Sequence, residues 1–405
     1  MKESIAVVGA NLAGGRAAQT LRKEGFEGDI HLIGMEPHPP YERPVLSKEV
    51  LLENCDPAQA YLQTEDAWEQ QGIQLRLSTV VTRIHRQSRQ LELSDGGLVR
   101  ANKVLLCTGG RVRRLPVPGA ELEGVEYLRT IDDAVAVRDR LQTGAPVVVI
   151  GGGFIGAEVA ACAKLNGCEV TMLEAEDVPL WRVLGHELGG ILCGIHRDQG
   201  VHVKTKTTVD RIEGNGRVTN VVTSEGERIE ASTVVIGVGI TPATELAEGA
   251  GLEVGNGIMV NEFCETSIPG IYAAGDVANH PNAILGGRVR LESWQNAQKQ
   301  ATAAAKSMLG ESKMFNDVPW FWSDQYDLNI QMSGQPDPTD SIVYRGDKSS
   351  RSFSAFFLRD GVLRSVVAFN RARDVKRTMT YIASRQILEP AQLGDESVDL
   401  RRLGD

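Results

Sequence analysis

The sequence predicts an α/β protein with two strand–turn–helix–strand units and a C-terminal region of α+β type. Three observations support this prediction. A buried strand, a glycine-rich turn, an alanine-rich helix and a second strand follow one another over residues 146–176, and the same order occurs over residues 4–36. From residue 315 onward, short apolar strands and a final helix replace that pattern.

The unit in the middle of the chain carries the fuller motif. An apolar strand from Val147 to Ile150 is followed by G-x-G-x-x-G, formed by Gly151, Gly153 and Gly156. The first glycine makes a tight turn, the second lets the backbone approach a pyrophosphate, and the third lets helix and strand pack closely. Glu174 ends the second strand, where a carboxylate binds ribose hydroxyls and repels a 2′-phosphate. This unit therefore predicts a site for NADH rather than NADPH.

The N-terminal unit repeats this order with one departure. Its turn runs from Gly9 to Gly14, and Asn11 stands where the middle glycine would be. Asparagine tolerates unusual backbone angles better than most residues, so we expect the turn to survive. Glu36 follows the second strand, in the right place for another adenosine ribose. Two such Rossmann-like units predict two dinucleotides, a tightly held flavin and a nicotinamide.

Other strands are expected to bring residues to the same sites. One strand ends in Thr108 and Gly109, another ends in Gly239, and a third delivers Asp276. Open α/β sheets bind ligands at the carboxyl ends of their strands. These four residues are therefore included among the predicted cofactor-binding residues.

A proline-rich loop follows the N-terminal unit and leads into a predicted helix that carries Lys48. Prolines fix the backbone, so such a loop is stiff and suits residues that lie against a planar ring. From the loop alone, Lys48 is either a solvated surface charge or a site residue.

Composition excludes several classes of function. With 405 residues, two or three domains are expected. The net charge of −10 does not favour general binding to nucleic acid or to an anionic membrane. No apolar run approaches the roughly 20 residues that span a bilayer, and no signal peptide is visible, so a cytoplasmic protein is expected. The six cysteines form no C-x-x-C pair and no metal-ligand spacing, which predicts free, buried thiols and no metal.

Several segments spread from end to end carry a family resemblance, among them YERPVLSK, VVIGGGFIGAEVAA, IYAAGDVA, VPWFWSDQY and LEPAQLGDESVDL. They resemble the FAD-dependent, NADH-oxidising ferredoxin reductases of bacterial oxygenase systems, of the putidaredoxin reductase and aromatic dioxygenase reductase types. The resemblance implies a glutathione reductase-like fold. Its domains would be an FAD-binding domain (1–109 and 240–314), an NADH-binding domain (110–239) and a C-terminal interface domain (315–405).

The resemblance also assigns residues by position. On the FAD side it implies Gly9, Ala13, Gly14, Glu36, Arg43, Lys48, Val81, Arg129, Asp276 and Trp294. On the NADH side it implies Gly151, Gly153, Ile155, Gly156, Glu158 and Glu174. The family pairs the lysine matching Lys48 with the glutamate matching Glu158 beside the site of hydride transfer. These two residues are the predicted catalytic pair.

The implied activity is transfer of a hydride from NADH to FAD, followed by transfer of single electrons to a two-iron, two-sulfur (2Fe-2S) ferredoxin. The ferredoxin would serve a haem-thiolate monooxygenase or a Rieske dioxygenase, as in aromatic hydrocarbon catabolism, so the reductase reaches the oxygenase only indirectly. Clustered cations would dock the acidic ferredoxin. The candidates are Arg288 with Arg290, or Arg371, Arg373, Lys376 and Arg377.

Two other functions stay open. An NADH oxidase or disulfide reductase of the same fold would need a cysteine beside the flavin, and the loop from Pro37 to Lys48 contains none. A redox-sensing flavoprotein resembling apoptosis-inducing factor would act as a binding partner rather than as a turnover enzyme.

Overall fold

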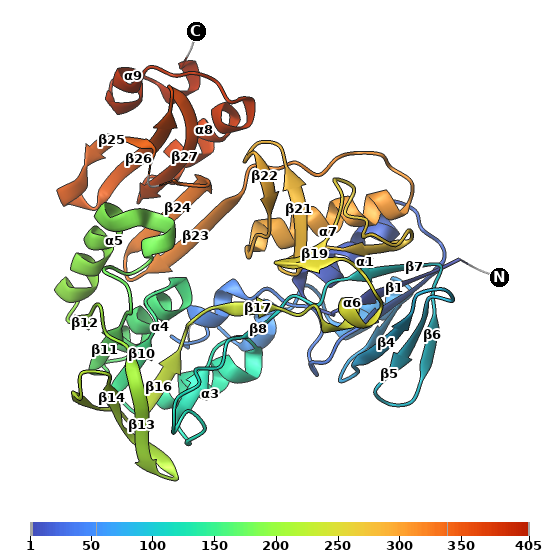
Figure 1. The fold of residues 1–405 in the computed structure, drawn as a ribbon, viewed down its shortest axis with the longest axis horizontal. Coiled ribbons are helices and arrows are strands. Elements are labelled where there is room, and N and C mark those ends of the chain that lie inside the picture. The colour runs from blue at the N-terminus through green and yellow to red at the C-terminus, as the bar shows by residue number, and fades with distance from the viewer. Residues whose placement is uncertain (1–2, 54, 338, 404–405) are drawn as a thin grey trace. The chain divides into compact units, whose positions relative to one another are not determined.

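The computed structural model describes residues 3–53, 55–337 and 339–403, and the chain divides into two compact units (Figure 1). Unit 1 comprises Met1–Glu42, Ala60–Arg111 and Thr241–Phe321. Unit 2 comprises Arg43–Gln59, Val112–Ile240 and Trp322–Asp405. Within the described ranges, no helix is long and apolar enough to cross a membrane. The three-domain division given above remains a prediction.

Unit 1 is built on a five-stranded parallel sheet in the order β20-β7-β1-β2-β3. The strands are β1 (Ser4–Val8), β2 (Asp29–Ile33), β3 (Ile73–Arg76), β7 (Lys103–Leu106) and β20 (Ile271–Ala273). Alternate residues of a strand point to opposite faces. Ile5 and Val7 accordingly pack with the apolar residues of helices α1 (Leu12–Lys23) and α7 (Trp294–Met308). Ala6 and Val8 pack on the other face against an antiparallel layer.

That layer consists of β4 (Val81–His85), β5 (Gln90–Leu93) and β6 (Leu98–Arg100). A mixed sheet, in which only β19 and β21 pair parallel, completes unit 1. Its strands are β18 (Val254–Gly255), β19 (Gly257–Met259), β21 (Ala278–Asn282) and β22 (Gly287–Val289). The short helices are α2 (Glu65–Gln70) and α6 (Glu245–Gly249). The chain passes between the units within β8 (Gly110–Val112) and β17 (Ile240–Pro242), and also after residues 42, 59 and 321.

Unit 2 contains a parallel sheet with the equivalent order, β12-β11-β10-β16-β9. Its strands are β9 (Val125–Tyr127), β10 (Val147–Ile150), β11 (Val170–Leu173), β12 (His202–Lys204) and β16 (Thr233–Ile236). The helices of unit 2 outside the C-terminal part are α3 (Ile131–Leu141), α4 (Phe154–Leu165) and α5 (Trp181–Asp198). An antiparallel layer packs against Val148 and Ile150 of β10. Its strands are β13 (Val209–Asn215), β14 (Arg217–Thr223) and β15 (Arg228–Glu230). In both parallel sheets the strand before the glycine turn is central.

The C-terminal part forms a five-stranded sheet in the order β23-β24-β27-β26-β25 (orange to red in Figure 1). The elements are β23 (Trp320–Gln325), β24 (Leu328–Gly334), β25 (Ser341–Asp347), β26 (Ser352–Arg359), β27 (Val362–Phe369), α8 (Ala372–Ser384) and α9 (Pro390–Gly394). The long strands pair antiparallel, and α8 packs against β24 and β27. Together with the two parallel sheets, this confirms the predicted fold class.

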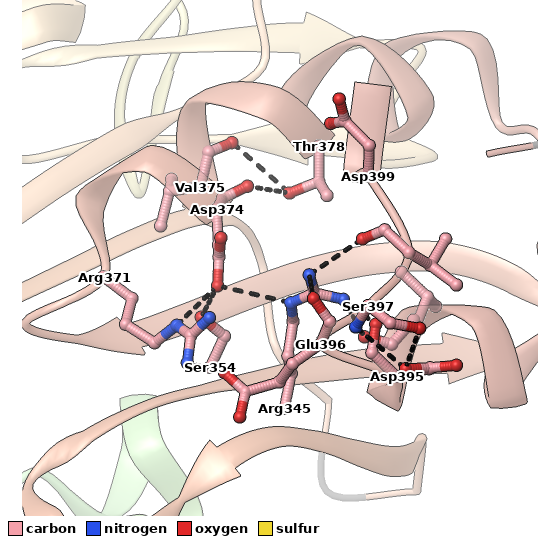
Figure 2. A network of polar contacts seen from close by, with 12 residues as sticks. Arg345, Ser354, Arg371, Asp374, Val375, Thr378, Asp395, Glu396, Ser397 and Asp399 are labelled. Carbon is pink, nitrogen blue, oxygen red and sulfur yellow. Dashed lines mark hydrogen bonds and ion pairs between the residues drawn. The ribbon is translucent and has the colours of Figure 1, made fainter. Parts of the chain in front are cut away.

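A buried arginine attaches the end of the chain to this sheet (Figure 2). Arg345 is 5% exposed and donates hydrogen bonds to the carbonyl oxygens of four residues, Leu393, Asp395, Glu396 and Val398. Its Nε lies 3.9 Å from a carboxylate oxygen of Asp374, which also accepts from Arg371 at 2.8 Å and from Ser354 at 2.9 Å. Because a buried guanidinium requires acceptors, Arg345 holds four carbonyl groups of segment 393–398, and Arg371 adds a bond to the Glu396 carboxylate.

The helix predicted at Lys48 is wrong. Lys48 does not lie on an α-helix: a 3-10 turn, η1 (Pro44–Ser47), ends immediately before it, and hydrogen-bonded turns follow. The proline at the first position of η1 suits a helix start, but the segment stops after a single turn. Residues 73–85 form two strands, β3 and β4, and Ser78 in the turn between them has a φ of 49°.

Candidate functional site

The glycine turn of unit 1 leaves no room for a side chain at Gly9 or Gly14. A Cβ on Gly9 would lie 2.1 Å from the carbonyl oxygen of Cys107, and one on Gly14 would lie 1.9 Å from that of Gly9. Gly9 also has a φ of +111°, which favours glycine. The turn therefore has the close strand–helix approach expected at a pyrophosphate site.

Asn11 supports this turn in a different way from the one predicted. Its backbone is extended, with φ −108° and ψ −170°, so no unusual backbone angle is needed. Its side chain instead caps helix α1, accepting hydrogen bonds from the amides of Ala13 at 3.0 Å and Gly14 at 3.2 Å. Its own amide donates to the Cys107 carbonyl at 2.6 Å.

The other predicted residues of unit 1 gather mainly at one edge of its sheet. Gly9 follows β1, Glu36 follows β2, Thr108 and Gly109 follow β7, and Asp276 follows β20, all at carboxyl ends of parallel strands. Glu36 accepts a hydrogen bond from Tyr41 at 2.5 Å, and Thr108 donates to the Ala243 carbonyl at 2.7 Å. Val81 begins β4, and Trp294 is the first residue of α7.

The glycine turn of unit 2 is more open at its middle position. A Cβ on Gly151 or Gly156 would collide with backbone, at 2.5 Å and 1.9 Å respectively. A Cβ on Gly153 would meet nothing nearer than the Gly237 carbonyl at 3.9 Å, and Gly153 caps helix α4 without a side-chain hydrogen bond. Gly239, with a φ of +93°, also faces open space. These features fit a dinucleotide that approaches the backbone closely.

Glu174 is held in place by this turn. One carboxylate oxygen accepts from the amide of Gly152 at 2.7 Å, and the other accepts from the amide of Glu176 at 2.8 Å. Ile155, in the first turn of α4, is 42% exposed, which is unusual for an isoleucine beside a buried strand. A fixed carboxylate and an apolar surface at one helix start fit a nicotinamide dinucleotide.

Lys48 and Glu158 form a buried ion pair in unit 2. They are 8% and 4% exposed, and Lys48 Nζ lies 3.5 Å from Glu158 Oε1. Lys48 Nζ also lies 3.5 Å from Asp324 Oδ2 and 4.9 Å from the centre of the Trp322 ring. Lys48 therefore contacts two carboxylates and an aromatic face. Of the two alternatives left open by the sequence, this excludes a solvated surface charge.

Two hydroxyl groups hold the carboxylate of Glu158. Ser47 donates to Oε2 at 2.5 Å, and Ser323 donates to Oε1 at 2.6 Å. Burial raises the pKa of Glu158, and Lys48 and the two serines oppose that shift. Sequence reasoning missed Ser47, Ser323 and Asp324. These residues lie in two segments that carry the family resemblance, YERPVLSK and VPWFWSDQY, but nothing in either segment indicates that their serines share one acceptor.

Arg43 and Arg129 are also brought together in unit 2. Arg43 donates a hydrogen bond to the backbone carbonyl of Arg129, and the Arg129 amide donates to Asp133 at 3.0 Å. Asp133 forms a capping box with Thr130 at the start of α3, which fixes the backbone that carries Arg129.

The two glycine turns, each at the carboxyl edge of a parallel sheet, define the class as an oxidoreductase with two dinucleotide-binding units. Comparison with known proteins agrees. The sequence profile of the family described as pyridine nucleotide-disulphide oxidoreductase matches residues 3–301, and the profile described as reductase C-terminal matches residues 320–404. The chain belongs to the pyridine nucleotide-disulphide oxidoreductase family.

Similar proteins match along almost their whole length. Rhodocoxin reductase of Rhodococcus erythropolis is 40% identical over 98% of this chain and 93% of its own. The anthranilate 1,2-dioxygenase system ferredoxin–NAD(+) reductase component of Burkholderia cepacia is 38% identical over 98% of each chain. The reductase of the covalent putidaredoxin reductase–putidaredoxin complex superposes with a TM-score of 0.96 at 38% identity, covering 98% of this chain and 97% of the other. The predicted family resemblance is confirmed.

Proposed function

We propose that this protein is an FAD-dependent ferredoxin–NAD(+) reductase, which takes a hydride from NADH and passes electrons singly to a 2Fe-2S ferredoxin of an oxygenase system. The observation that carries the proposal is the buried Lys48–Glu158 pair, in a chain with two dinucleotide turns. Full-length similarity to proteins named as ferredoxin reductases supports it.

FAD, when bound, accepts two electrons together and releases them one at a time. The chain's own residues bind, orient and supply charge. Gly9, Gly14 and Asp276 would hold FAD in unit 1, with Glu36 near its ribose. Lys48 would supply a fixed positive charge that favours electron transfer onto bound FAD. Glu158 balances that charge in the resting protein.

The preference for NADH follows from Glu174. Its carboxylate is fixed by two backbone amides and accepts hydrogen bonds from ribose hydroxyls, whereas a 2′-phosphate would place like charges together. Gly153 and Gly156 would bind the pyrophosphate of NADH, and Ile155 would contact the nicotinamide side.

The two candidate groups of cations for ferredoxin docking differ in how far they are already engaged. Arg288 donates to the carbonyl oxygens of Val260 and Asn279, and Arg290 is paired with Glu292 at 2.6 Å. In the second group, Arg371 is paired with Asp374 at 2.8 Å and with Glu396 at 2.5 Å, whereas Arg373 and Lys376 on α8 are exposed. We therefore favour the α8 cations as the docking group for an acidic ferredoxin.

The alternative functions gain no support. An NADH oxidase or disulfide reductase needs an accessible reactive cysteine, but the six cysteines are free thiols and five of them are buried. No observation favours a redox-sensing binding protein over a turnover enzyme, and the similar proteins named above are reductases. A cytoplasmic location is part of the proposal.

The role of Lys48 is tested by Lys48→Met, which keeps the side-chain length and removes the charge. Flavin reduction by NADH, followed anaerobically by stopped flow, is expected to slow about 10²-fold with FAD still bound. The matched control is Lys164→Met, at the far end of the same helix that carries Glu158. Equal rates in Lys48→Met and the control would refute the role.

A further inference from the structure

A buried chain of hydrogen bonds leads from helix α5 to Glu158. Ser323 Oγ contacts Glu158 at 2.6 Å and accepts from the side-chain amide of Gln325 at 3.0 Å. The carbonyl oxygen of that amide lies 2.9 Å from Nε2 of His196, and Nδ1 of His196 lies 2.9 Å from the hydroxyl of Tyr326. Ser323 and His196 are 0% exposed, and Gln325 is 1% exposed.

The chemistry of these groups gives the chain one direction. An ionised carboxylate only accepts hydrogen bonds, so Ser323 donates to Glu158 and its oxygen accepts from the Gln325 amide. The Gln325 carbonyl then accepts from Nε2–H of His196, which makes His196 a neutral ring protonated at Nε2. Tyr326 donates to the remaining nitrogen. All four donors therefore point toward the carboxylate of Glu158, and successive hydrogen bonds in such a series polarise one another.

The surrounding titratable groups agree with this direction. Burial lowers the pKa of His196 to about 4 and raises the pKa of Tyr326, so both are neutral at pH 7. Cys162, one turn along α4 from Glu158, has its pKa raised to about 12 by burial and by that carboxylate. Among the described residues, the charge that acts on Glu158 is that of Lys48, at 3.5 Å; Asp324 contacts Lys48, and Glu49 acts on Cys162.

We propose that Ser323, Gln325 and His196 are positioning residues that hold Glu158 as a fixed anion beside Lys48. Protonating Glu158 would replace the carboxylate that accepts from Ser323 by a neutral and weaker acceptor, so the hydrogen bond from Ser323 favours the ionised form. The hydrogen bond from Ser323 therefore opposes the rise in the pKa of Glu158 that burial causes, and Gln325 and His196 hold Ser323 in the orientation that donates. This inference rests on the proposed function of Lys48 for its effect on catalysis, but not for its effect on Glu158.

The test follows the protonation of Glu158 in the FAD-loaded protein. Infrared difference spectra recorded across a pH titration contain the carboxylic acid C=O band of Glu158, identified by its absence in Glu158→Gln. In Ser323→Ala this band is expected to appear about one pH unit higher than in the wild type, because a hydrogen bond to the charged form is lost. Ser323→Thr keeps the hydroxyl and is expected to restore the wild-type titration.

Ser365→Ala is the matched control. Ser365 is 0% exposed in the same C-terminal sheet, and its hydroxyl has no hydrogen-bond partner among the described residues. Gln325→Leu is measured in parallel, so that the test survives if Ser323→Ala fails to fold. It is expected to shift the band in the same direction by a smaller amount, because Ser323 remains.

The rate of flavin reduction by NADH gives a second readout. The wild type and Ser365→Ala are expected to hold their rate over the pH range in which Ser323→Ala loses it. An unchanged Glu158 titration in both Ser323→Ala and Gln325→Leu would overturn the inference. A normal rate in Lys48→Met with a shifted titration in Ser323→Ala would overturn the proposed role of Lys48 and leave the positioning role of Ser323 standing.

Discussion

Removing the charge of Lys48 should destabilise the folded protein in a way that depends on pH. In Lys48→Met, Glu158 keeps its hydrogen bonds from Ser47 and Ser323 but loses the ammonium 3.5 Å away. Glu158 is 4% exposed, so water cannot replace that ammonium. The variant therefore leaves a buried carboxylate without its counter-ion.

The expected loss at pH 8 is about 3–5 kcal/mol, the usual cost of breaking a buried pair from one side. Replacing both partners by apolar residues is often close to neutral. The double variant Lys48→Met with Glu158→Leu is therefore expected to recover most of the loss, which separates the charge effect from the change in packing.

The sign of the pH dependence follows from the pKa of Glu158, which burial raises above its ordinary value. A group with a raised pKa contributes stability that is complete below its pKa in the unfolded chain and is lost as pH rises through its folded pKa. Losing Lys48 raises that folded pKa further. Consider the pH range between the pKa of Glu158 in the folded wild type and its pKa in folded Lys48→Met. Across this range, the difference in unfolding free energy between the two proteins should shrink by about 1.4 kcal/mol per pH unit as pH falls.

Urea unfolding of the FAD-saturated proteins, followed by circular dichroism at several pH values, measures this difference. Midpoints are compared only where the slope m is unchanged, so that they report stability. A loss of stability that is the same at pH 5 and pH 8, or a double variant no more stable than Lys48→Met, would refute the reasoning.

Three further predictions concern other parts of the chain. Arg345→Met should cost about 3 kcal/mol, because four carbonyl groups lose their donor, and amide exchange over residues 393–398 should accelerate while exchange in β10 does not. Glu174→Ser should reduce the preference for NADH over NADPH at least about tenfold in steady-state kcat/KM, and an unchanged ratio would exclude Glu174 as the selector. Arg373→Glu with Lys376→Glu should raise KM for ferredoxin and weaken its salt dependence, while ferricyanide reduction stays constant; equal effects on both acceptors would count against docking on α8.

The regular parts of this fold could be predicted because its local patterns are unambiguous. An apolar strand followed by glycines and a small-residue helix has few other solutions, and both central strands, β1 and β10, form where that pattern places them. The close backbone contacts at Gly14 and Gly156 explain why glycine is required there.

The details of the site could not be predicted, because they depend on residues far apart in the sequence. Ser323 reaches Glu158 across 165 residues, and Ser47 reaches it across 111. No periodicity of either segment indicates a shared acceptor. The expected helix at Lys48 failed for a related reason: the segment packs against α4 through long-range contacts, which override local helix preference. Asn11 is a third case. Its presence in place of a glycine was expected to matter for the backbone angles of the turn, but its backbone is extended and its side chain caps helix α1 instead.

The proposed reaction moves electrons from NADH to a ferredoxin. The most direct test is anaerobic reduction of the purified, FAD-loaded protein by NADH and, separately, by NADPH, followed by addition of a 2Fe-2S ferredoxin with cytochrome c as the final acceptor. We predict fast bleaching with NADH, slow bleaching with NADPH, and cytochrome c reduction that requires the ferredoxin. Fast bleaching with no gain from any of several such ferredoxins would contradict the claim.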